Sequence, residues 1–268
     1  MFPPSRIVCL TEETVETLYL LREERRIVGV SGYAVRPPQV RREKPRVSAF
    51  ISADFEKIIA LEPDLVLTFS DLQADIAAEL IRRNVAVHAF NQRDVAGIFA
   101  MIRTLGALVG ASEKAEALAA SLERRLDTAR TQAAQLPRRP RVYFEEWDEP
   151  MISGIQWVSE LIEIAGGIEA FPQLAGNKSA KDRIVSAENV IAAAPDIIVG
   201  SWCGKRFVPA KVKARPGFAA IPAVRDGELH EIKSAMILQP GPAALTDGLD
   251  QLVRIVGDWA SRVSSSVR

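Results

Sequence analysis

The sequence predicts an α/β protein of two lobes joined by one long α-helix, and three observations lead to this fold class. Strand-like and helix-like segments alternate along the 268 residues, as is typical of parallel sheets covered by helices. One pattern occurs twice, at residues 54–67 and 186–199, about half the chain apart. Between the two copies, residues 112–136 keep an uninterrupted helical pattern. Two similarly built lobes with a helix between them follow from this arrangement.

The repeated pattern reads DFEKIIALEPDLVL in the first copy and SAENVIAAAPDIIV in the second. Asp54 and Ser186 are predicted to cap a short helix, with Glu56 and Glu188 in its first turn. A proline then ends the helix, because the residue before proline avoids helical geometry. Three β-forming residues follow and predict a buried parallel strand. We therefore expect one equivalent helix–strand unit in each lobe.

The first half begins with a strand at residues 6–10, which leads into a helix capped by Thr11. The early turns of this helix contain Glu12, Glu13 and Glu16, and the helix dipole favours carboxylates there. Further strands are predicted at 26–30, 65–67 and 85–90, and further helices at 75–83 and 94–109. Residues 34–46 read as a proline-rich loop with an excess of basic residues.

The predicted helix 112–136 starts at Ser112, ends before Pro137, and would be about 36 Å long. It reads as a rigid connector, since a flexible linker would be rich in glycine and serine. The second half continues with strands at 141–144, 197–199 and 229–232, helices at 157–165 and up to 262, and an acidic aromatic turn at 145–150. The predicted division is a lobe at 1–110, a connecting helix at 111–137 and a lobe at 138–268.

The composition and the motifs argue against several classes of function. Lys and Arg total 34, and so do Asp and Glu, which argues against a nucleic-acid-binding protein. No run approaches 18 apolar residues, so no transmembrane helix is expected. Cys9, Cys203 and two histidines are too few and too dispersed for a metal site, and we expect Cys9 to be a buried structural thiol. No phosphate-binding, nucleophile or dinucleotide motif is present, which favours a binding protein without catalytic residues or a resident cofactor.

Aromatic residues follow several predicted strands. In parallel α/β folds, ligands bind beyond the carboxyl ends of the strands. The aromatic residues at strand ends, in the loops after them or at a helix start are Tyr33, Phe50, Phe69, Trp147, Trp157, Trp202 and Phe207. Core packing is the competing interpretation, and it suits Phe99, Phe144, Phe218 and Trp259 better. The placement predicts a broad apolar cleft between the lobes for a large flat or bulky ligand.

Four segments carry a family resemblance: EKIIALEPDLVL, GVSGY followed by a Pro-Pro pair, GGIEAF and PDIIV. With them the chain resembles the substrate-binding proteins of ABC importers for vitamin B12, siderophores and heme, and most of all the vitamin B12 (cobalamin) type. The likeness spans about residues 6–259. It implies two Rossmann-like α/β lobes, one bridging helix, and a ligand cleft between the lobes.

The resemblance also implies roles for particular residues. Tyr33, Phe50 and Phe69 match positions where the first lobe contacts a corrinoid ligand. In the second lobe the corresponding candidates are Trp147, Trp157 and Trp202. Glu56 and Glu188 match the surface glutamates that dock on the permease. The implied partners are a corrinoid and an ABC importer permease dimer, with the binding protein itself monomeric and without nucleic acid.

Other interpretations stay open. A heme- or ferric-siderophore-binding protein has the same fold, and Tyr33 could serve as an axial heme ligand. A chelatase-like enzyme would need a cluster drawn from Glu145, Glu146 and His230. A cytoplasmic corrinoid-handling protein is a further alternative. The resemblance implies a periplasmic protein, yet the sequence as given has no secretory signal pattern. A cytoplasmic location and an export signal outside this sequence are therefore both open.

Overall fold

The computed structural model describes residues 3–265 and divides into two compact units. Residues up to 92 together with 96–121 form the first unit, and residues 93–95 together with 122 onward form the second. The division after Ser121 falls inside α6 (Ser112–Ala133), which is one continuous helix. The predicted role of residues 111–137 as a rigid connector stays a prediction.

The first unit contains a sheet of five parallel strands in the order β3-β2-β1-β4-β5. Its strands are β1 (Ile7–Cys9), β2 (Ile27–Ser31), β3 (Arg46–Ser48), β4 (Leu65–Phe69) and β5 (Val87–Phe90). Its helices are α1 (Glu12–Leu20), η1 (Glu24–Arg26), α2 (Val40–Glu43), α3 (Phe55–Ala60), η2 (Asp71–Gln73), α4 (Ala74–Arg82) and α5 (Val95–Leu108).

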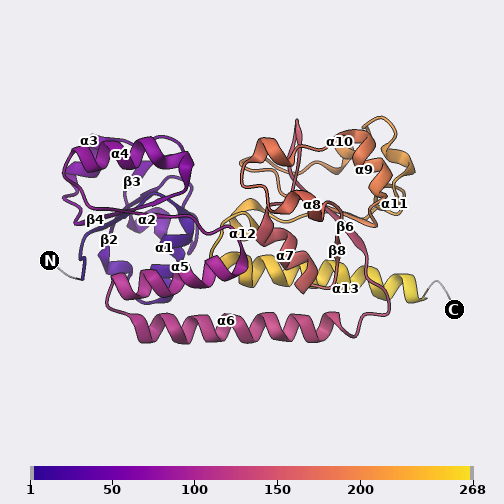
Figure 1. The fold of residues 1–268 in the computed structure, drawn as a ribbon, viewed down its shortest axis with the longest axis horizontal. Helices are drawn as coiled ribbons and strands as arrows, with labels where there is room; N and C mark the ends of the chain where they lie inside the picture. The colour runs from indigo at the N-terminus through magenta and orange to yellow at the C-terminus, as the bar shows by residue number, and fades with distance from the viewer. Residues whose placement is uncertain (1–2, 266–268) are drawn as a thin grey trace. The chain divides into compact units, whose positions relative to one another are not determined.

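Strand β1 lies at the centre of this sheet and is buried on both faces. Val8 packs with Ile58 of α3 and Leu80 of α4 on one face. Figure 1 shows α3 and α4 on one side of the sheet and α1 and α5 on the other. Cys9 is fully buried, and desolvation raises the pKa of its thiol to about 12. The prediction of a structural thiol is confirmed.

The second unit is built on a second sheet, in the order β10-β9-β6-β7, with β8 also paired to β6. Its strands are β6 (Arg141–Asp148), β7 (Met151–Ser153), β8 (Ile168–Glu169), β9 (Ile197–Gly200) and β10 (Leu229–Glu231). Its helices are α7 (Gln156–Ile164), α8 (Pro172–Ala175), η3 (Ala180–Arg183), α9 (Ala187–Ala193), α10 (Pro209–Lys213), η4 (Phe218–Ala220), α11 (Pro222–Arg225), α12 (Ser234–Ile237), the π-helical η5 (Ala244–Gly248) and α13 (Leu249–Ser265).

The core of the second unit has two faces, as the alternation of strand residues requires. Tyr143 and Ile198 point to the face where Val190 of α9, Val212 of α10 and Phe218 pack. Helices α7 and α13 contact each other, α7 also contacts β6, and both lie on the opposite side of the sheet (Figure 1). The prediction of two α/β lobes with parallel sheets is confirmed, and β7 alone runs antiparallel to its neighbour.

Each copy of the repeat forms the same helix–strand unit, one in each sheet. Asp54 accepts a hydrogen bond from the Lys57 backbone N–H, and Ser186 forms a capping box with Asn189. The carboxylate after the proline ties each unit to the central strand of its sheet. Asp64 accepts from the Arg6 backbone N–H at 2.9 Å, and Asp196 accepts from the Arg141 backbone N–H at 2.8 Å. Each copy of the repeat therefore contains the carboxylate that binds it to the neighbouring strand.

The guanidinium groups of Arg6 and Arg141 complete this equivalence. Arg6 Nε donates to the carbonyl of Leu61 at 3.0 Å, and Arg141 Nη1 donates to the carbonyl of Ala193 at 2.7 Å. These carbonyls lie at matching places near the ends of α3 and α9. A helix end leaves carbonyls without intrahelical partners, and a cationic donor satisfies them well.

Two local expectations were wrong, and a third was right in position only. Thr11 occupies the N-cap position, but its hydroxyl donates to Glu13 and makes no cap hydrogen bond. The loop 34–46 contains the short helix α2 and the start of β3, because Lys44 Nζ donates to the carbonyls of Glu24 and Ile27 and holds the segment against β2. The segment 145–150 is mostly strand: β6 continues to Asp148 and pairs with β7 as a hairpin.

Candidate functional site

The carboxyl ends of the strands in the first unit lead into loops that hydrogen bonds join together. The Gly32 backbone N–H after β2 donates to the Ser48 carbonyl of β3 at 2.7 Å. Gln73, in η2 after β4, donates from Nε2 to the carbonyls of Leu10 at 3.2 Å and Phe50 at 2.8 Å. These bonds bring the loops after β1, β2, β3 and β4 to one edge of the sheet, where parallel α/β folds bind ligands.

Three large apolar side chains are exposed in these loops: Tyr33 is 55% exposed, Ile51 73% and Leu72 55%. We call these residues the edge patch. Each follows a different strand, β2, β3 or β4. Large apolar side chains exposed in loops at the edge where ligands are expected are candidates for a binding surface. Sequence reasoning found Tyr33 and missed Ile51 and Leu72, because hydrophobicity alone does not distinguish an exposed apolar side chain from a buried one.

The other predicted aromatic residues of the first unit lie deeper. Phe50 is half-buried, and its carbonyl is the acceptor for Gln73. Phe69 is buried at 5% exposure, and its backbone N–H donates to Gln73 Oε1 at 2.9 Å. The structure therefore places Tyr33 and Phe50 within reach of the surface and Phe69 in the core. The ligand-binding roles of all three stay predictions.

Two carboxyl groups follow the central strand at the same edge. Glu12 and Glu13 are buried, at 6% and 2% exposure, and desolvation raises their pKa values to about 7 and about 8. Thr11 Oγ1 donates to Glu13 Oε1 at 2.7 Å, while Glu12 Oε2 makes no hydrogen bond within residues 3–265. A carboxyl group that keeps its proton can donate a hydrogen bond, and near pH 7 this holds more for Glu13 than for Glu12. The helix-dipole interpretation from sequence did not anticipate this burial.

In the second unit, the carboxyl half of β6 carries a buried ion pair. Glu145 has no exposed surface, and Arg215 binds it through both guanidinium branches, at 2.5 Å and 2.9 Å. Tyr143 Oη donates to Glu145 at 3.2 Å, and Trp202 Nε1 donates to it at 2.9 Å. Next along the strand, Glu146 pairs with the fully buried Arg183 at 2.6 Å. Adjacent strand residues thus hold two separate arginines, as their opposite directions require.

The tryptophans predicted for the second unit divide into surface and core. Trp147 is half-buried, with Lys205 Nζ 3.9 Å from the centroid of its ring. Trp157 and Trp202 are buried at 4% and 2% exposure. Trp157 donates from Nε1 to the Ile237 carbonyl at 2.8 Å, and Trp202 packs edge-on against Phe207. Within this unit the surface therefore offers Trp147 to a ligand, and the other two stabilise the core; ligand contacts for all three stay predictions.

The residues proposed for a chelatase-like metal site do not come together. Glu145 pairs with Arg215, Glu146 with Arg183, and His230 lies 2.9 Å from Glu228. Across the described part of the chain, no group of three or more His, Cys, Asp or Glu side chains could hold a metal ion. The cluster expected for that alternative is not formed.

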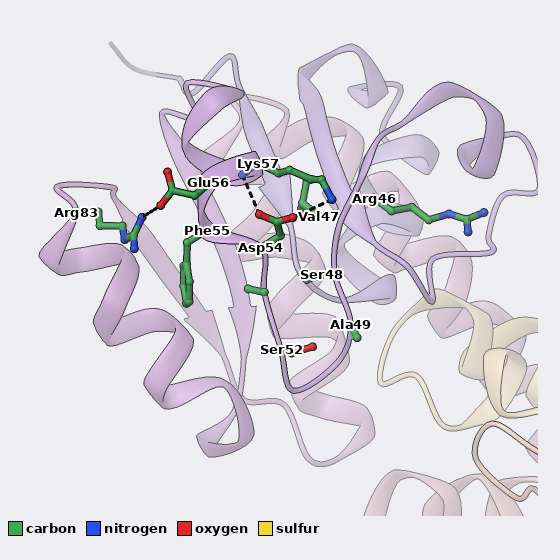
Figure 2. A pocket seen from close by; sticks show the side chains of 11 residues that line it. Arg46, Val47, Ser48, Ala49, Ser52, Asp54, Phe55, Glu56, Lys57 and Arg83 are labelled. Atoms are coloured by element: carbon green, nitrogen blue, oxygen red, sulfur yellow. Dashed lines mark hydrogen bonds and ion pairs between the residues drawn. The ribbon is translucent and has the colours of Figure 1, made fainter.

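The glutamates predicted to dock on a permease are both exposed near a helix N-terminus. Figure 2 shows Glu56 beside a groove of about 630 Å³ that Asp54, Lys57 and Arg46 also line. Glu56 pairs with Arg83 at 2.7 Å, and Asp54 pairs with Lys57 at 2.8 Å. In the second unit, the backbone N–H of Glu188 and the Ser186 hydroxyl lower the pKa of Glu188, so it is ionised. Both carboxylates are available at the surface, and docking itself stays a prediction.

Comparison with known proteins shows which family the chain belongs to. The periplasmic binding protein family matches residues 7–236, which is most of the sequence. The chain belongs to this family. Members of the family bind solutes, and the two-unit α/β fold is the architecture expected from the sequence. Among the described residues, no helix is long and apolar enough to cross a membrane.

Three relatives illustrate the similarity. The vitamin B12-binding protein of Vibrio cholerae is 26% identical over 255 residues, covering 94% of this chain and 88% of that protein. An uncharacterised ABC transporter substrate-binding lipoprotein of Bacillus subtilis is 24% identical, covering 94% of this chain and 80% of that protein. The periplasmic heme-binding protein of Roseiflexus matches with a TM-score of 0.80 and 25% identity, over 94% of this chain and 99% of that structure.

Proposed function

We propose that this protein binds cobalamin or a related corrinoid outside the cytoplasmic membrane and delivers it to an ABC importer. The observation that carries the proposal is the edge patch, where Tyr33, Ile51 and Leu72 are exposed at the carboxyl ends of the first sheet. Apolar burial against a large ring is the interaction that such a surface supplies. The relatedness to a vitamin B12-binding protein along 94% of the chain supports the same ligand class.

The polar groups beside the edge patch favour a corrin over a heme. The corrin ring carries amide side chains, whereas heme carries propionate carboxylates. Glu12 and Glu13 begin α1, just after the central strand of the first sheet, and Gln73 lies in η2 after β4. Neutral carboxyl and amide groups hydrogen-bond to amides. Buried carboxyl groups do not stabilise a propionate placed beside them, because they carry no positive charge.

Heme is the second candidate ligand, and Tyr33 is the observation that favours it. Its side chain is exposed at the ligand edge, so its phenol could act as an axial ligand to heme iron. A heme-binding relative with a TM-score of 0.80 supports this alternative. Replacing the hydroxyl alone separates the two candidates, since a corrin needs only the ring.

Delivery to the importer is proposed to use Glu56 and Glu188. Both carboxylates are exposed and lie in equivalent copies of the repeat. Exposed charges steer association with a partner of opposite charge, and they do so more weakly as salt rises. A monomeric binding protein could present both carboxylates to a permease dimer.

The proposal is tested by ligand titration of matched variants. We expect Tyr33→Ala and Leu72→Ala each to weaken cyanocobalamin binding, with Tyr33→Ala costing on the order of tenfold in Kd. Leu20→Ala is the control, because Leu20 is exposed to a similar extent, at 49%, but lies at the end of α1 outside the edge patch. Tyr33→Phe should keep cyanocobalamin affinity. The opposite outcome has two parts: the parent protein binds hemin but no cyanocobalamin, and Tyr33→Phe loses hemin binding. That outcome would favour heme as the ligand.

A further inference from the structure

A cavity in the second unit, distinct from the ligand edge, has no role in the proposed function. It has a volume of about 350 Å³ and is lined by residues of α7 and α8, by Val95 and Arg130, and by Glu169 of β8. Glu169 pairs with Val142 at the beginning of β6, whereas Trp147 and its neighbours lie at the end of that strand. The cavity is therefore at the opposite end of the sheet from the edge at which ligands are expected.

Part of the cavity lining is acidic. Glu160, Glu163 and Glu169 all line it. Glu160 accepts hydrogen bonds from the Val95 backbone N–H at 2.7 Å and from Gln156 at 3.0 Å. Glu163 accepts from the Glu169 backbone N–H at 3.0 Å and pairs with Arg139 at 2.6 Å. Both of these carboxylates thus have donors from the protein itself.

Glu169 differs from its two neighbours. It is 4% exposed, and its Oε1 accepts from the Phe171 backbone N–H at 3.2 Å. Its Oε2 has no partner of good hydrogen-bond geometry within residues 3–265, and the side chain of Ser159, which is 6% exposed, interacts with the Glu169 carboxylate. Burial raises the pKa of Glu169 to about 7, although hydrogen bonds from the Phe171 backbone N–H and from the Ser159 side chain oppose the shift. Buried polar atoms without partners are rare, and each of them needs an explanation.

Apolar residues line the cavity as well. Ile164 and Pro172 line it together with Val95 and Ala175. The charged residue of opposite sign, Arg130, pairs with Asp127 at 2.8 Å. A cavity that combines apolar residues with an unsatisfied oxygen of a buried carboxylate complements a molecule with an apolar body and a cationic donor. A bare metal ion fits poorly, since no metal-binding group forms in the described residues.

We propose that this cavity binds a small organic ammonium compound. Its N–H groups would donate to Glu169 Oε2 and Ser159 Oγ, and its hydrocarbon part would lie against Ile164 and Pro172. The ammonium supplies the opposite charge that a buried carboxylate needs. This cavity is separate from the site proposed for the corrinoid in the first unit. Its ligand can therefore be tested independently of the proposed function.

The test is calorimetric titration at pH 8 with phenethylammonium, and with the uncharged 2-phenylethanol as its matched probe. We expect saturable binding of one phenethylammonium per protein and at least tenfold weaker binding of the alcohol. Glu169→Gln should weaken phenethylammonium binding about tenfold, and Ala175→Phe, which fills the cavity, should abolish it. Glu188→Gln is the control, because Glu188 is an exposed glutamate of the same unit outside the cavity.

Two results would overturn the proposal. One is the absence of saturable phenethylammonium binding to the parent protein. The other is equal binding of the ammonium and the alcohol, or binding that both Glu169→Gln and Ala175→Phe leave unchanged. Tryptophan fluorescence shows whether each variant is folded, since Trp157 and Trp202 are buried in this unit. Cyanocobalamin titration of the same variants should give the parent affinity, which separates the two sites.

Discussion

Replacing Arg215 by methionine should strongly destabilise the second unit. The change leaves Glu145 fully buried without its ionic partner, while the hydrogen bonds from Tyr143 and Trp202 remain. Removing one member of a buried ion pair typically costs about 3–5 kcal/mol, because the other charge stays desolvated. Arg215 itself is 16% exposed in its side chain, so solvent screens this pair weakly. We expect a loss of free energy of unfolding within that range.

Tryptophan fluorescence measures this unit selectively. All four tryptophans, Trp147, Trp157, Trp202 and Trp259, belong to the second unit. A urea titration followed by tryptophan emission therefore reports the unfolding of that unit. With a urea dependence of about 2 kcal/mol per molar, the midpoint for Arg215→Met should fall by about 2 M.

Two further variants make the result interpretable. Arg225→Met removes an exposed pair with Asp226, and such pairs are worth about 0–1 kcal/mol. The double variant Arg215→Met with Glu145→Gln removes the buried charge as well, and should recover part of the lost stability. If Arg215→Met unfolds at the same urea concentration as Arg225→Met, the assignment of a structural ion pair at β6 is refuted.

Three other changes test separate parts of the account. Gly200→Ala should cost about 1–3 kcal/mol, because an added Cβ would overlap the Phe207 ring; an unchanged urea midpoint by tryptophan emission would contradict this. Folding raises the pKa of Glu13 from 4.5 to about 8, so the folded state keeps a proton that the unfolded chain releases. Stability should therefore fall as pH rises from about 5 to 8, by up to about 1.4 kcal/mol per pH unit. Circular dichroism in urea should show a shallower fall for Glu13→Gln, and an equal slope would disprove the assignment. Glu56→Ala with Glu188→Ala should keep cyanocobalamin affinity and reduce uptake through the cognate importer; normal uptake would exclude the docking role.

Much of the fold could be predicted because the repeat contains its own structural signals. Asp54 and Ser186 cap their helices, and the carboxylates of Asp64 and Asp196 bind the neighbouring strand in the same way. Local side-chain chemistry determines each of these contacts. The antiparallel β7 was not predicted, because its pairing with β6 depends on a tight hairpin that acidic and aromatic residues do not signal.

The site was harder to predict, because burial is a tertiary property. Trp157 and Trp202 lie near strand ends, where aromatic residues are expected to face a ligand. Their indole N–H groups instead donate to the Ile237 carbonyl and to Glu145 in the core. A glutamate at the start of a helix is usually exposed, but Glu12 is buried in this fold. Conversely, Leu72 looks like a core residue but is exposed. Hydrophobic periodicity cannot separate these cases, since each side chain's environment comes from segments distant in sequence.

The central claim is most directly tested by calorimetric titration of the purified protein with cyanocobalamin, and separately with hemin. The account predicts saturable binding of one cyanocobalamin per protein, with an affinity that depends on the edge patch of Tyr33, Ile51 and Leu72. Hemin should bind more weakly, because the buried carboxyl groups of Glu12 and Glu13 offer no positive charge to its propionates. Saturable hemin binding with no detectable heat from cyanocobalamin would contradict the account.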